Sequence, residues 1–266
     1  MVIKNLVLSG GGIKGIAHCG ALGALDLTNV HDVLGVSIGA LIGMMFCVGY
    51  TPKEMYNVIL ETDFSSLFEP RLLELVETYG MDSGKLLMKW VNKLLLNKGF
   101  ENPTFETLYK KTGKNLRILT TNITTAKYEI FDKDSSPDAK VMDILRMSIS
   151  IPLLFGYKKY KGNVYADGAI TNTCPIQEYK DVLDVSFGIK LEGPLVQSVD
   201  SFKDYLNNIF ICIDKRIALT DEEKKSTLVI NIDVSLLDFG ICKKTKRKIM
   251  DYGKQVASEF FTAALA

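Results

Sequence analysis

Apolar residues recur along this chain in two patterns, as short runs rich in leucine and β-branched residues and as longer stretches with helical spacing. The short runs predict strands at residues 4–9, 31–36, 116–122, 128–131, 163–166, 182–189 and 227–233. The helical spacing predicts helices at residues 16–27, 38–48, 52–61, 83–98, 104–111, 141–149, 201–217 and 243–265. Strands that alternate with helices are typical of an α/β fold, so we predict a largely parallel central sheet with helices on both faces.

The longest uncharged stretch, residues 33–50, approaches the length of a membrane-spanning helix. It contains Gly35 and Gly39 on either side of Ser37, and it begins like a strand. A buried strand, a sharp turn and a buried helix explain the stretch better than a membrane span does. We therefore expect it in the core of the protein.

The composition is that of an ordinary globular protein, with 32 basic and 31 acidic side chains among 266 residues. The net charge of +1 gives no general attraction to nucleic acid, so we expect no nucleic-acid partner. No Pro-, Gly- or Ser-rich tract separates one part of the sequence from another. We predict one domain over residues 1–266.

The five cysteines are widely spaced and form neither a CxxC pair nor a Cys/His cluster. This pattern predicts neither a zinc site nor a disulfide framework. The apolar stretch near the N-terminus is too short for a secretory signal. We therefore expect a cytoplasmic protein in a reducing compartment, without a metal site.

The strongest local motif is a G-x-S-x-G sequence centred on Ser37, between a predicted strand and a predicted helix. Such a nucleophile elbow holds the serine in a strained turn, where Gly35 and Gly39 avoid clashes. The helix that follows directs its N-terminal amides toward a developing oxyanion. Glycine-rich turns without catalytic function have the same pattern, so the motif alone leaves both interpretations open.

A nucleophilic Ser37 needs a base, and a triad of the α/β-hydrolase order is excluded because no histidine follows Ser37. The two histidines, His18 and His31, precede it and are expected to be structural or solvent-facing. Asp167, which ends a predicted strand and is followed by Gly and Ala, is the best candidate base. We expect modest help from its partial burial, since an ordinary carboxylate is a weak base. The alternative is a turn aspartate that caps its own backbone.

A second glycine-rich turn, residues 10–15, lies between the first predicted strand and the first predicted helix. Its backbone amides and the charge of Lys14 form an anion-binding arrangement suited to an oxyanion or a phosphate. The turn also satisfies the G-x-G-x-x-G dinucleotide fingerprint, which keeps nucleotide binding as an alternative. Against this alternative, Asp32 lies at the start of the second strand, whereas the fingerprint needs an acidic residue at its end.

The two glycine-rich turns and the aspartate turn resemble, in order and spacing, the motifs of the patatin-like phospholipase family: residues 10–15, 35–39 and 167–169. Weaker similarities occur in the middle of the chain, at residues 103–108, 119–122 and 147–152. The likeness covers roughly residues 4–190. It implies the three-layer α/β fold of that family. Lys14 departs from the arginine that many relatives carry, because it keeps the positive charge but lacks the planar guanidinium.

The resemblance implies a lipid acyl hydrolase of the phospholipase A or lysophospholipase type, without metal or cofactor. Ser37 would attack the acyl carbonyl and Asp167 would take its proton, while the oxyanion hole would consist of Gly10, Gly11 and Gly12, with Lys14 supporting the charge. The remaining motif glycines would shape the turns: Gly15, Gly35, Gly39 and Gly168. The expected substrate is a phospholipid or a lysophospholipid. The alternatives are a nucleotide-binding protein and a catalytically inactive, lipid-binding member of the family.

Two basic segments are candidates for contact with lipid. The predicted helix at residues 83–98 has an apolar face that includes Trp90 and is flanked by lysines, which suits an anionic membrane surface. Packing of this face on the core is the preferred alternative. The run at residues 243–248 either adds attraction to lipid or simply begins a surface helix. We expect a peripheral membrane contact and make no prediction of the oligomeric state.

Overall fold

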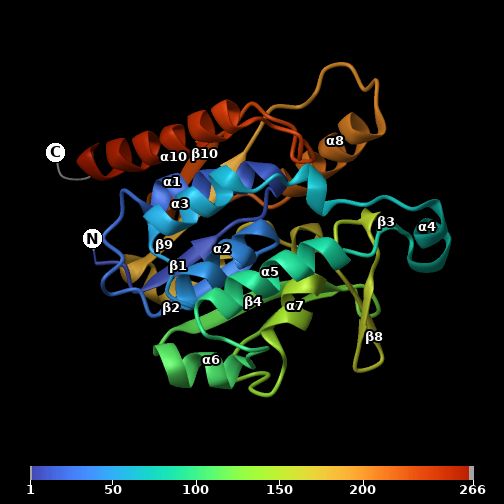
Figure 1. The fold of residues 1–266 in the computed structure, drawn as a ribbon. Helices are drawn as coiled ribbons and strands as arrows, with labels where there is room; N and C mark the ends of the chain where they lie inside the picture. Colours follow the sequence, from blue (N-terminus) through green and yellow to red (C-terminus); the bar gives the residue numbers. More distant parts are fainter. Residues whose placement is uncertain (1, 264–266) are drawn as a thin grey trace.

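The computed structural model describes residues 2–263 and has a central sheet with helices on both faces (Figure 1). Within these residues eight strands join in the order β10-β9-β1-β2-β4-β8-β7, with β5 paired to β4 beside this path. The strands are β1 (Asn5–Leu8), β2 (Asp32–Val36), β4 (Asn115–Asn122), β5 (Lys127–Phe131), β7 (Lys158–Tyr160), β8 (Asn163–Ala166), β9 (Ser186–Glu192) and β10 (Thr227–Asn231). A separate pair consists of β3 (Gly80–Asp82) and β6 (Leu153–Phe155).

The centre of the sheet is parallel, as predicted. Strands β10, β9, β1, β2 and β4 all run in one direction, whereas β5 and β8 are antiparallel to β4, and β7 is antiparallel to β8. Parallel strands need crossover connections, which the helices supply. The carboxyl ends of the central strands therefore meet at one edge of the sheet, where functional sites of α/β proteins usually form.

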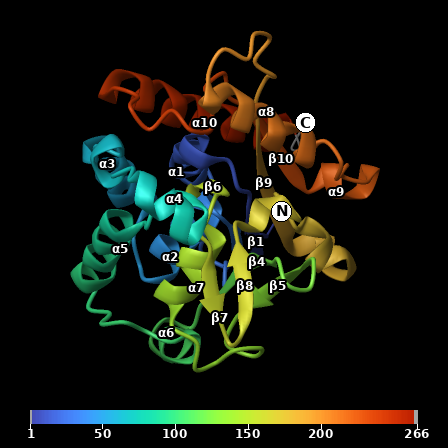
Figure 2. The same cartoon turned by 90° about the vertical axis from the view of Figure 1, so that its right-hand side faces the viewer.

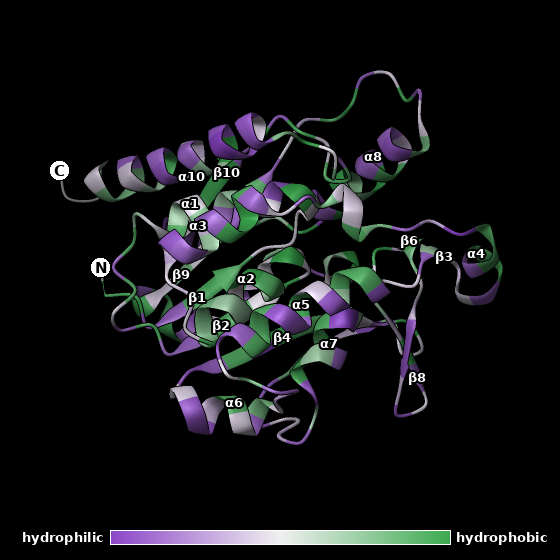
Figure 3. Ribbon diagram, in the orientation of Figure 1, coloured by the Kyte–Doolittle hydropathy of each residue, from purple (hydrophilic) through white to green (hydrophobic). Residues whose placement is uncertain are grey.

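Alternate residues of the central strands point to opposite faces, and both faces are buried. In β1, Leu6 and Leu8 join the larger apolar core, while Val7 joins a smaller core on the other face. The larger core is covered by α1 (Ile16–Leu22), α2 (Ile38–Cys47), α3 (Pro52–Glu61), α5 (Lys85–Asn97), α7 (Val141–Ser148) and α10 (Lys243–Ala263). Figure 3 shows hydrophobic residues concentrated on the central strands and α2, and hydrophilic ones on the outer helix α10.

The remaining elements are short or lie at the periphery. They are η1 (Gly12–Gly15), η2 (Ser65–Leu67), α4 (Leu72–Thr78), α6 (Phe105–Thr112), η3 (Gly168–Ile170), η4 (Ile176–Val185), α8 (Phe202–Asp214) and α9 (Asp221–Lys225). The sequence patterns did not predict η2, α4, β3, β6, β7, η3 or α9, because segments of three to seven residues carry too little periodicity.

Two predicted boundaries are wrong by four residues or more, and a third cannot be compared. Helix α1 ends at Leu22, and the apolar residues after it reach the core from a turn. The strand predicted at residues 182–189 is β9, which begins only at Ser186. The apolar residues before it belong to the end of η4, where Leu183 packs against the smaller core, and this made them resemble part of a buried strand. The predicted end of the last helix, at residue 265, lies outside the described residues.

The uncharged stretch at residues 33–50 forms β2, a tight turn at Ser37 and the buried helix α2, as predicted. Every residue of α2 after Ile38 is buried against the sheet and the helices around it. Among residues 2–263, no helix has both the length and the apolar character needed to cross a bilayer.

Candidate active site

Ser37 occupies the turn between β2 and α2 in a strained conformation, with φ of 53°. Few residues other than glycine adopt this region, and such strain is concentrated at functional sites. A Cβ on Gly39 would collide with the carbonyl oxygens of Leu8 and Ser9, and one on Gly35 would collide with the backbone of α2. The two motif glycines therefore allow α2 to pack directly against β1 and β2, which lifts Ser37 above the edge of the sheet.

The structure brings Ser37 and Asp167 into direct contact across 130 residues of sequence. The Ser37 Oγ donates a hydrogen bond of 2.7 Å to Asp167 Oδ2. The second carboxylate oxygen, Oδ1, accepts a 2.8 Å hydrogen bond from the amide of Ala169. The hydrogen bond from Ser37 has the geometry required of a nucleophile and its base.

Asp167 reaches Ser37 by a route that differs from the predicted one. The sequence placed it at the carboxyl end of a strand in a parallel sheet, but β8 runs antiparallel to β4 and pairs with it at Thr121 and Asn122 alone. The last two residues of β8 pair with the last two residues of β4, in the opposite direction. The carboxyl end of β8 therefore lies beside the carboxyl end of β4, at the same edge of the sheet as Ser37. A Cβ on Gly168 would collide with the Leu119 carbonyl, so this glycine allows the close approach of the turn to β4.

Asp167 is more deeply buried than we predicted. It is almost completely enclosed, with 1% exposure, and not partially buried as we expected from the sequence. Burial raises the pKa of Asp167 from 3.8 to about 7, against the opposing effect of its hydrogen bonds from Ser37 and Ala169. A carboxylate with a pKa near neutrality is a much stronger base toward an alcohol than an ordinary aspartate.

The last residue of α7, Ser148, and the segment that follows it hold both members of the pair in place. The amide of Ser37 donates to Ser148 Oγ at 2.9 Å, and this hydroxyl in turn donates to the Leu119 carbonyl at 2.7 Å. Two residues later, the carbonyl of Ser150 accepts a 2.9 Å hydrogen bond from the Asp167 amide. Residues 147–152 resemble the corresponding segment of the family, but the sequence predicts no role for Ser148 or Ser150. A serine in a buried helix has no local pattern that predicts its partners.

The glycine-rich loop offers free backbone donors next to Ser37. The amide of Gly10 is occupied by the Thr173 carbonyl at 2.9 Å, while the amides of Gly11 and Gly12 have no hydrogen-bond partner within the described residues. Gly12 has φ of 55°, and a Cβ there would collide with the Leu236 carbonyl. Gly15 lies against the side chain of Ile38, so it brings this loop close to the elbow. The prediction that Gly10 donates to the oxyanion is therefore wrong, because its amide is already bonded, and Gly11 and Gly12 are the available donors of this loop.

Lys14 is buried, with 4% exposure, but its ammonium group lies against Gly193, just beyond the end of β9. In the sheet β1 lies between β9 and β2. The glycine-rich loop follows β1, so the Lys14 ammonium group, at the end of β9, and Ser37, at the end of β2, lie on opposite sides of this loop. Burial lowers the pKa of Lys14, and the charges of Asp214 and Glu192 partly oppose this shift. Lys14 thus lines the same cavity as Ser37 from the opposite side of the loop.

The histidines occupy the structural positions expected of them. His18 is fully buried, and burial lowers its pKa to about 4, so that a neutral ring donates from Nε2 to the Ser9 carbonyl at 3.0 Å. His31 is exposed at the start of β2. Asp32 binds Asn115 and Tyr179 at the amino end of the same strand, which weighs against the dinucleotide interpretation. Within residues 2–263, no group of three or more His, Cys, Asp or Glu side chains is placed to hold a metal ion.

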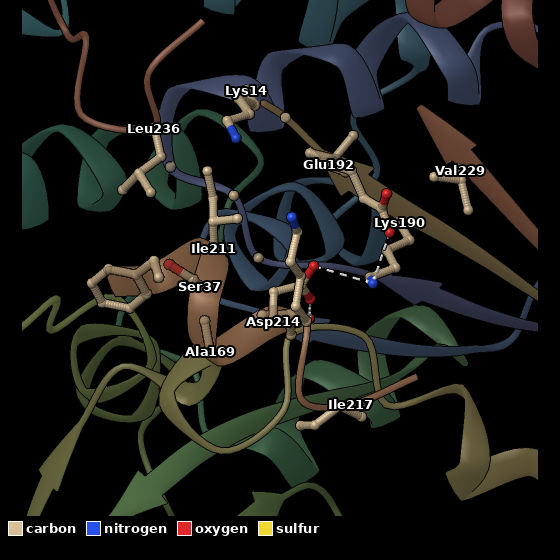
Figure 4. A pocket seen from close by; sticks show the side chains of 18 of the residues that line it. Lys14, Ser37, Ala169, Lys190, Glu192, Ile211, Asp214, Ile217, Val229 and Leu236 are labelled. Carbon is tan, nitrogen blue, oxygen red and sulfur yellow. Dashed lines mark hydrogen bonds and ion pairs between the residues drawn. The ribbon is translucent and has the colours of Figure 1, made fainter. Parts of the chain in front are cut away.

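Ser37 lies where two cavities meet. A cavity of about 400 Å³ contains the glycine loop, Asp167 and a charged wall that includes Lys190 and Asp214 (Figure 4). A smaller cavity of about 70 Å³ on the other side of Ser37 has apolar walls, which include Phe64, Phe68 and Phe155. The site therefore combines a charged compartment and an apolar compartment around one hydroxyl group.

The fold and this geometry define a class of α/β proteins in which a serine at a strand–helix elbow contacts a buried carboxylate. Residues 6–179 match the sequence model of the patatin-like phospholipase family. The chain belongs to this family, and its membership supports lipid hydrolase activity.

The chain is also similar to two viral proteins and, in its fold, to a solved structure. The chain is 29% identical over 274 residues to an uncharacterized protein of Acanthamoeba polyphaga mimivirus, covering 94% of this chain and 91% of that protein. It is 33% identical over 179 residues to a probable lipid hydrolase of Invertebrate iridescent virus 6, covering 65% of this chain and 62% of that relative. The crystal structure of VipD from Legionella pneumophila has the same fold, with a TM-score of 0.64, 19% identity, and coverage of 99% of this chain and 67% of VipD.

Proposed function

We propose that this protein hydrolyses fatty-acyl esters of phospholipids or lysophospholipids through an acyl intermediate on Ser37. The observation that carries the proposal is the 2.7 Å hydrogen bond from Ser37 Oγ to the buried Asp167 carboxylate. Burial raises the pKa of Asp167 to about 7, which suits this carboxylate to accept the Ser37 proton near neutral pH.

In the proposed reaction Ser37 Oγ attacks the ester carbonyl while Asp167 takes the hydroxyl proton. The amides of Gly11 and Gly12 hold the negative oxygen of the tetrahedral intermediate, and Lys14 adds positive charge from the far side of the loop. The alcohol of the lipid leaves with the proton from Asp167. Water then attacks the acyl-serine with Asp167 again as base, which releases the fatty acid and restores the hydroxyl.

The proposed intermediate predicts that an organophosphonate ester will label Ser37. Such a reagent forms a stable covalent adduct with an activated serine, so we expect one adduct per chain by intact mass, located at Ser37 by peptide mapping. The Ser37→Ala variant should give no adduct, whereas Ser226→Ala, at a buried serine outside the site, should be labelled like the wild type. Adducts of equal yield in Ser37→Ala would contradict the proposed nucleophile.

We further propose that the protein meets its substrate at a lipid surface through α4. The helix that contains Trp90 is not available for this contact, because Val91, Leu94 and Leu95 are buried and Trp90 packs edge-on against Phe64 at 5.8 Å. The basic run at residues 243–248 begins α10, and Lys246 within it is buried. The Trp90 helix is therefore mainly structural, whereas the basic run keeps exposed charges at Lys243 and Lys244 and remains the alternative contact.

Helix α4 presents apolar side chains to solvent without a partner among the described residues. Leu72, Leu73 and Val76 are 85%, 69% and 75% exposed, and none of the residues of this helix is buried. Exposed apolar clusters of this kind usually mark an interaction surface. The chain enters α4 shortly after Phe68 and leaves it into β3, which pairs with β6 at Phe155. Both phenylalanines line the apolar cavity. Helix α4 packs against β3 and lies close to β6 (Figure 2), so we propose that a lipid contact at α4 leads toward the compartment that suits an acyl chain.

A double substitution, Leu72→Asp with Leu73→Asp, is expected to lower binding to phosphatidylcholine vesicles at least about tenfold. The reason is the lost burial of two leucines, each worth about 1.5–3 kcal/mol when fully buried. Co-sedimentation with vesicles measures the effect. The matched control, Lys243→Glu with Lys244→Glu on α10, should bind like the wild type. If the Lys243/Lys244 variant lost binding and the Leu72/Leu73 variant kept it, the lipid contact would lie at the basic run instead.

We also propose that residues 1–266 act as one domain in a reducing, cytoplasmic compartment. The single domain is supported by β9 and β10, which come from the C-terminal third of the chain and extend the sheet from β1. The reducing compartment is supported by the five cysteines, which are all free thiols.

A further inference from the structure

Arg146 is a buried cation whose direct partners are neutral groups. It lies in α7 with 4% exposure, and burial lowers its pKa to about 10, so the guanidinium is still charged near neutral pH. Within the described residues Asp82 and Glu74 act on this charge from longer range, without an ion pair. A buried guanidinium is costly unless its donors are bonded. Its hydrogen bonds therefore indicate which parts of the protein it holds together.

One side of the guanidinium binds the chain where it leaves the β3–β6 pair. Nε and Nη2 donate to the Ser83 carbonyl, just after β3, at 3.2 and 2.9 Å. Nη2 also donates to the Gly156 carbonyl, just after β6, at 3.1 Å. The guanidinium lies over the ring of Phe155, 5.5 Å from its centre, and this ring lines the apolar cavity beside Ser37. Arg146 thus fastens the ends of both strands.

The other side of the guanidinium binds the turn that holds Asp167. Nη1 donates to the Ser150 hydroxyl, and this hydroxyl in turn donates to the Arg146 carbonyl at 2.7 Å. The carbonyl of Ser150 accepts the Asp167 amide at 2.9 Å. Two hydrogen bonds through Ser150 therefore connect the guanidinium to the residue whose carboxylate contacts Ser37.

We infer that Arg146 is a positioning residue that sets the place of Asp167 relative to Ser37 by holding the Ser150 turn against the β3–β6 pair. The inference rests on the proposed hydrolysis, in which Asp167 is the base. Proton transfer needs the carboxylate within hydrogen-bond distance of the hydroxyl, and a misplacement of about 1 Å can cost about 10²-fold in rate. Loss of the guanidinium releases the turn on one side, so it should slow the proton transfer.

Two substitutions test this link from its two ends. Arg146→Met keeps an unbranched side chain of similar length, and we expect kcat for fatty-acid release to fall about 30- to 100-fold. Ser150→Ala removes only the hydroxyl, and we expect kcat to fall about tenfold with KM within about twofold of the wild type. Because both changes break the same contact, the double variant should lose little more than Arg146→Met alone. If Arg146→Met does not fold, an unchanged kcat in Ser150→Ala still overturns the inference.

Lys246→Met is the matched control for the loss of a buried cation. Lys246 is 3% exposed, donates to the carbonyls of Ile59 and Thr62, and lies over the ring of Phe64 in the wall of the same apolar cavity. Its described contacts do not include the Ser150 turn. We expect a lower Tm and a kcat within about twofold of the wild type. A loss of kcat as large as in Arg146→Met would assign the effect to general damage and overturn the inference.

A background without the base separates positioning from a merely structural role. The rate at which an organophosphonate labels Ser37 should fall at least about tenfold when Arg146→Met is made in the wild type. In Asp167→Asn no base remains to be placed, so the same substitution should lower the residual rate less than about twofold. Equal factors in both backgrounds overturn the inference. A wild type that is labelled but releases no fatty acid contradicts the proposed hydrolysis alone, and one that is neither labelled nor active contradicts both.

Discussion

The Asp167→Asn variant is expected to lower kcat/KM for release of fatty acid from phospholipid by about 10³-fold or more. Asparagine fits the same space, and its side-chain oxygen can still accept the hydrogen bond from the Ala169 amide. However, an amide cannot take the proton of Ser37, so the hydroxyl loses its base. Removal of a general base typically costs 10²–10⁴-fold, and here no second base contacts Ser37 within the described residues.

Kinetics on folded variants provide the measurement, with circular dichroism as the check of folding. Ser37→Ala should lose at least as much activity, and the double variant should lose little more than either single one, because the two residues act as a unit. Asp184→Asn, at an exposed aspartate outside the site, is the matched control and should behave like the wild type. The wild-type kcat/KM should rise with pH and level off above about 7, where Asp167 is ionised. Asp167→Asn activity within tenfold of the wild type would exclude Asp167 as the base.

The individual turns of the site could be predicted because each depends on local sequence. Gly35 and Gly39 are required by the approach of α2 to β1 and β2, and that requirement leaves a recognisable pattern around Ser37. The absence of any histidine after Ser37 then directed attention to a carboxylate. Asp167 was the best candidate because it ends a predicted strand and is followed by small residues, but the turn-aspartate alternative stayed open until the resemblance to a family was considered. No local pattern reveals a contact across 130 residues.

Features that depend on long-range packing could not be predicted. The near-complete burial of Asp167 follows from the way β8 enters the sheet against β4, and a four-residue strand does not show its direction in its sequence. The roles of Ser148 and Lys190 were missed for the same reason, since their partners lie on other elements. Helix α4 escaped prediction because a seven-residue helix with exposed leucines matches neither a core helix nor a polar surface helix.

Burial of the Asp167 carboxylate also has a consequence for stability. The folded protein raises the pKa of this group from 3.8 to about 7, so the folded state holds the proton more tightly than the unfolded state does. The stabilising effect of that proton is complete below pH 3.8 and is lost progressively as the pH rises to 7. Above pH 7 the wild type carries a penalty on the order of 4 kcal/mol, from about 1.36 kcal/mol for each of roughly three pKa units.

Asp167→Asn is therefore expected to be more stable than the wild type at pH 8 while it is nearly inactive. Asparagine is neutral at every pH, so the variant avoids the penalty of a buried charge and keeps a partner for Ser37. The gain in free energy of unfolding, measured by urea titration, should be small at pH 4, grow to at most about 4 kcal/mol near pH 7 and stay constant above. The difference in free energy of unfolding between variant and wild type is taken at each pH, so that the contributions of all other titrating groups cancel. Asp184→Asn controls for the loss of one surface charge. A gain that does not change between pH 4 and pH 8 would mean that the Asp167 carboxylate is solvated in the folded protein. Burial would then not raise its pKa, and Asp167 would be no stronger a base than an ordinary aspartate.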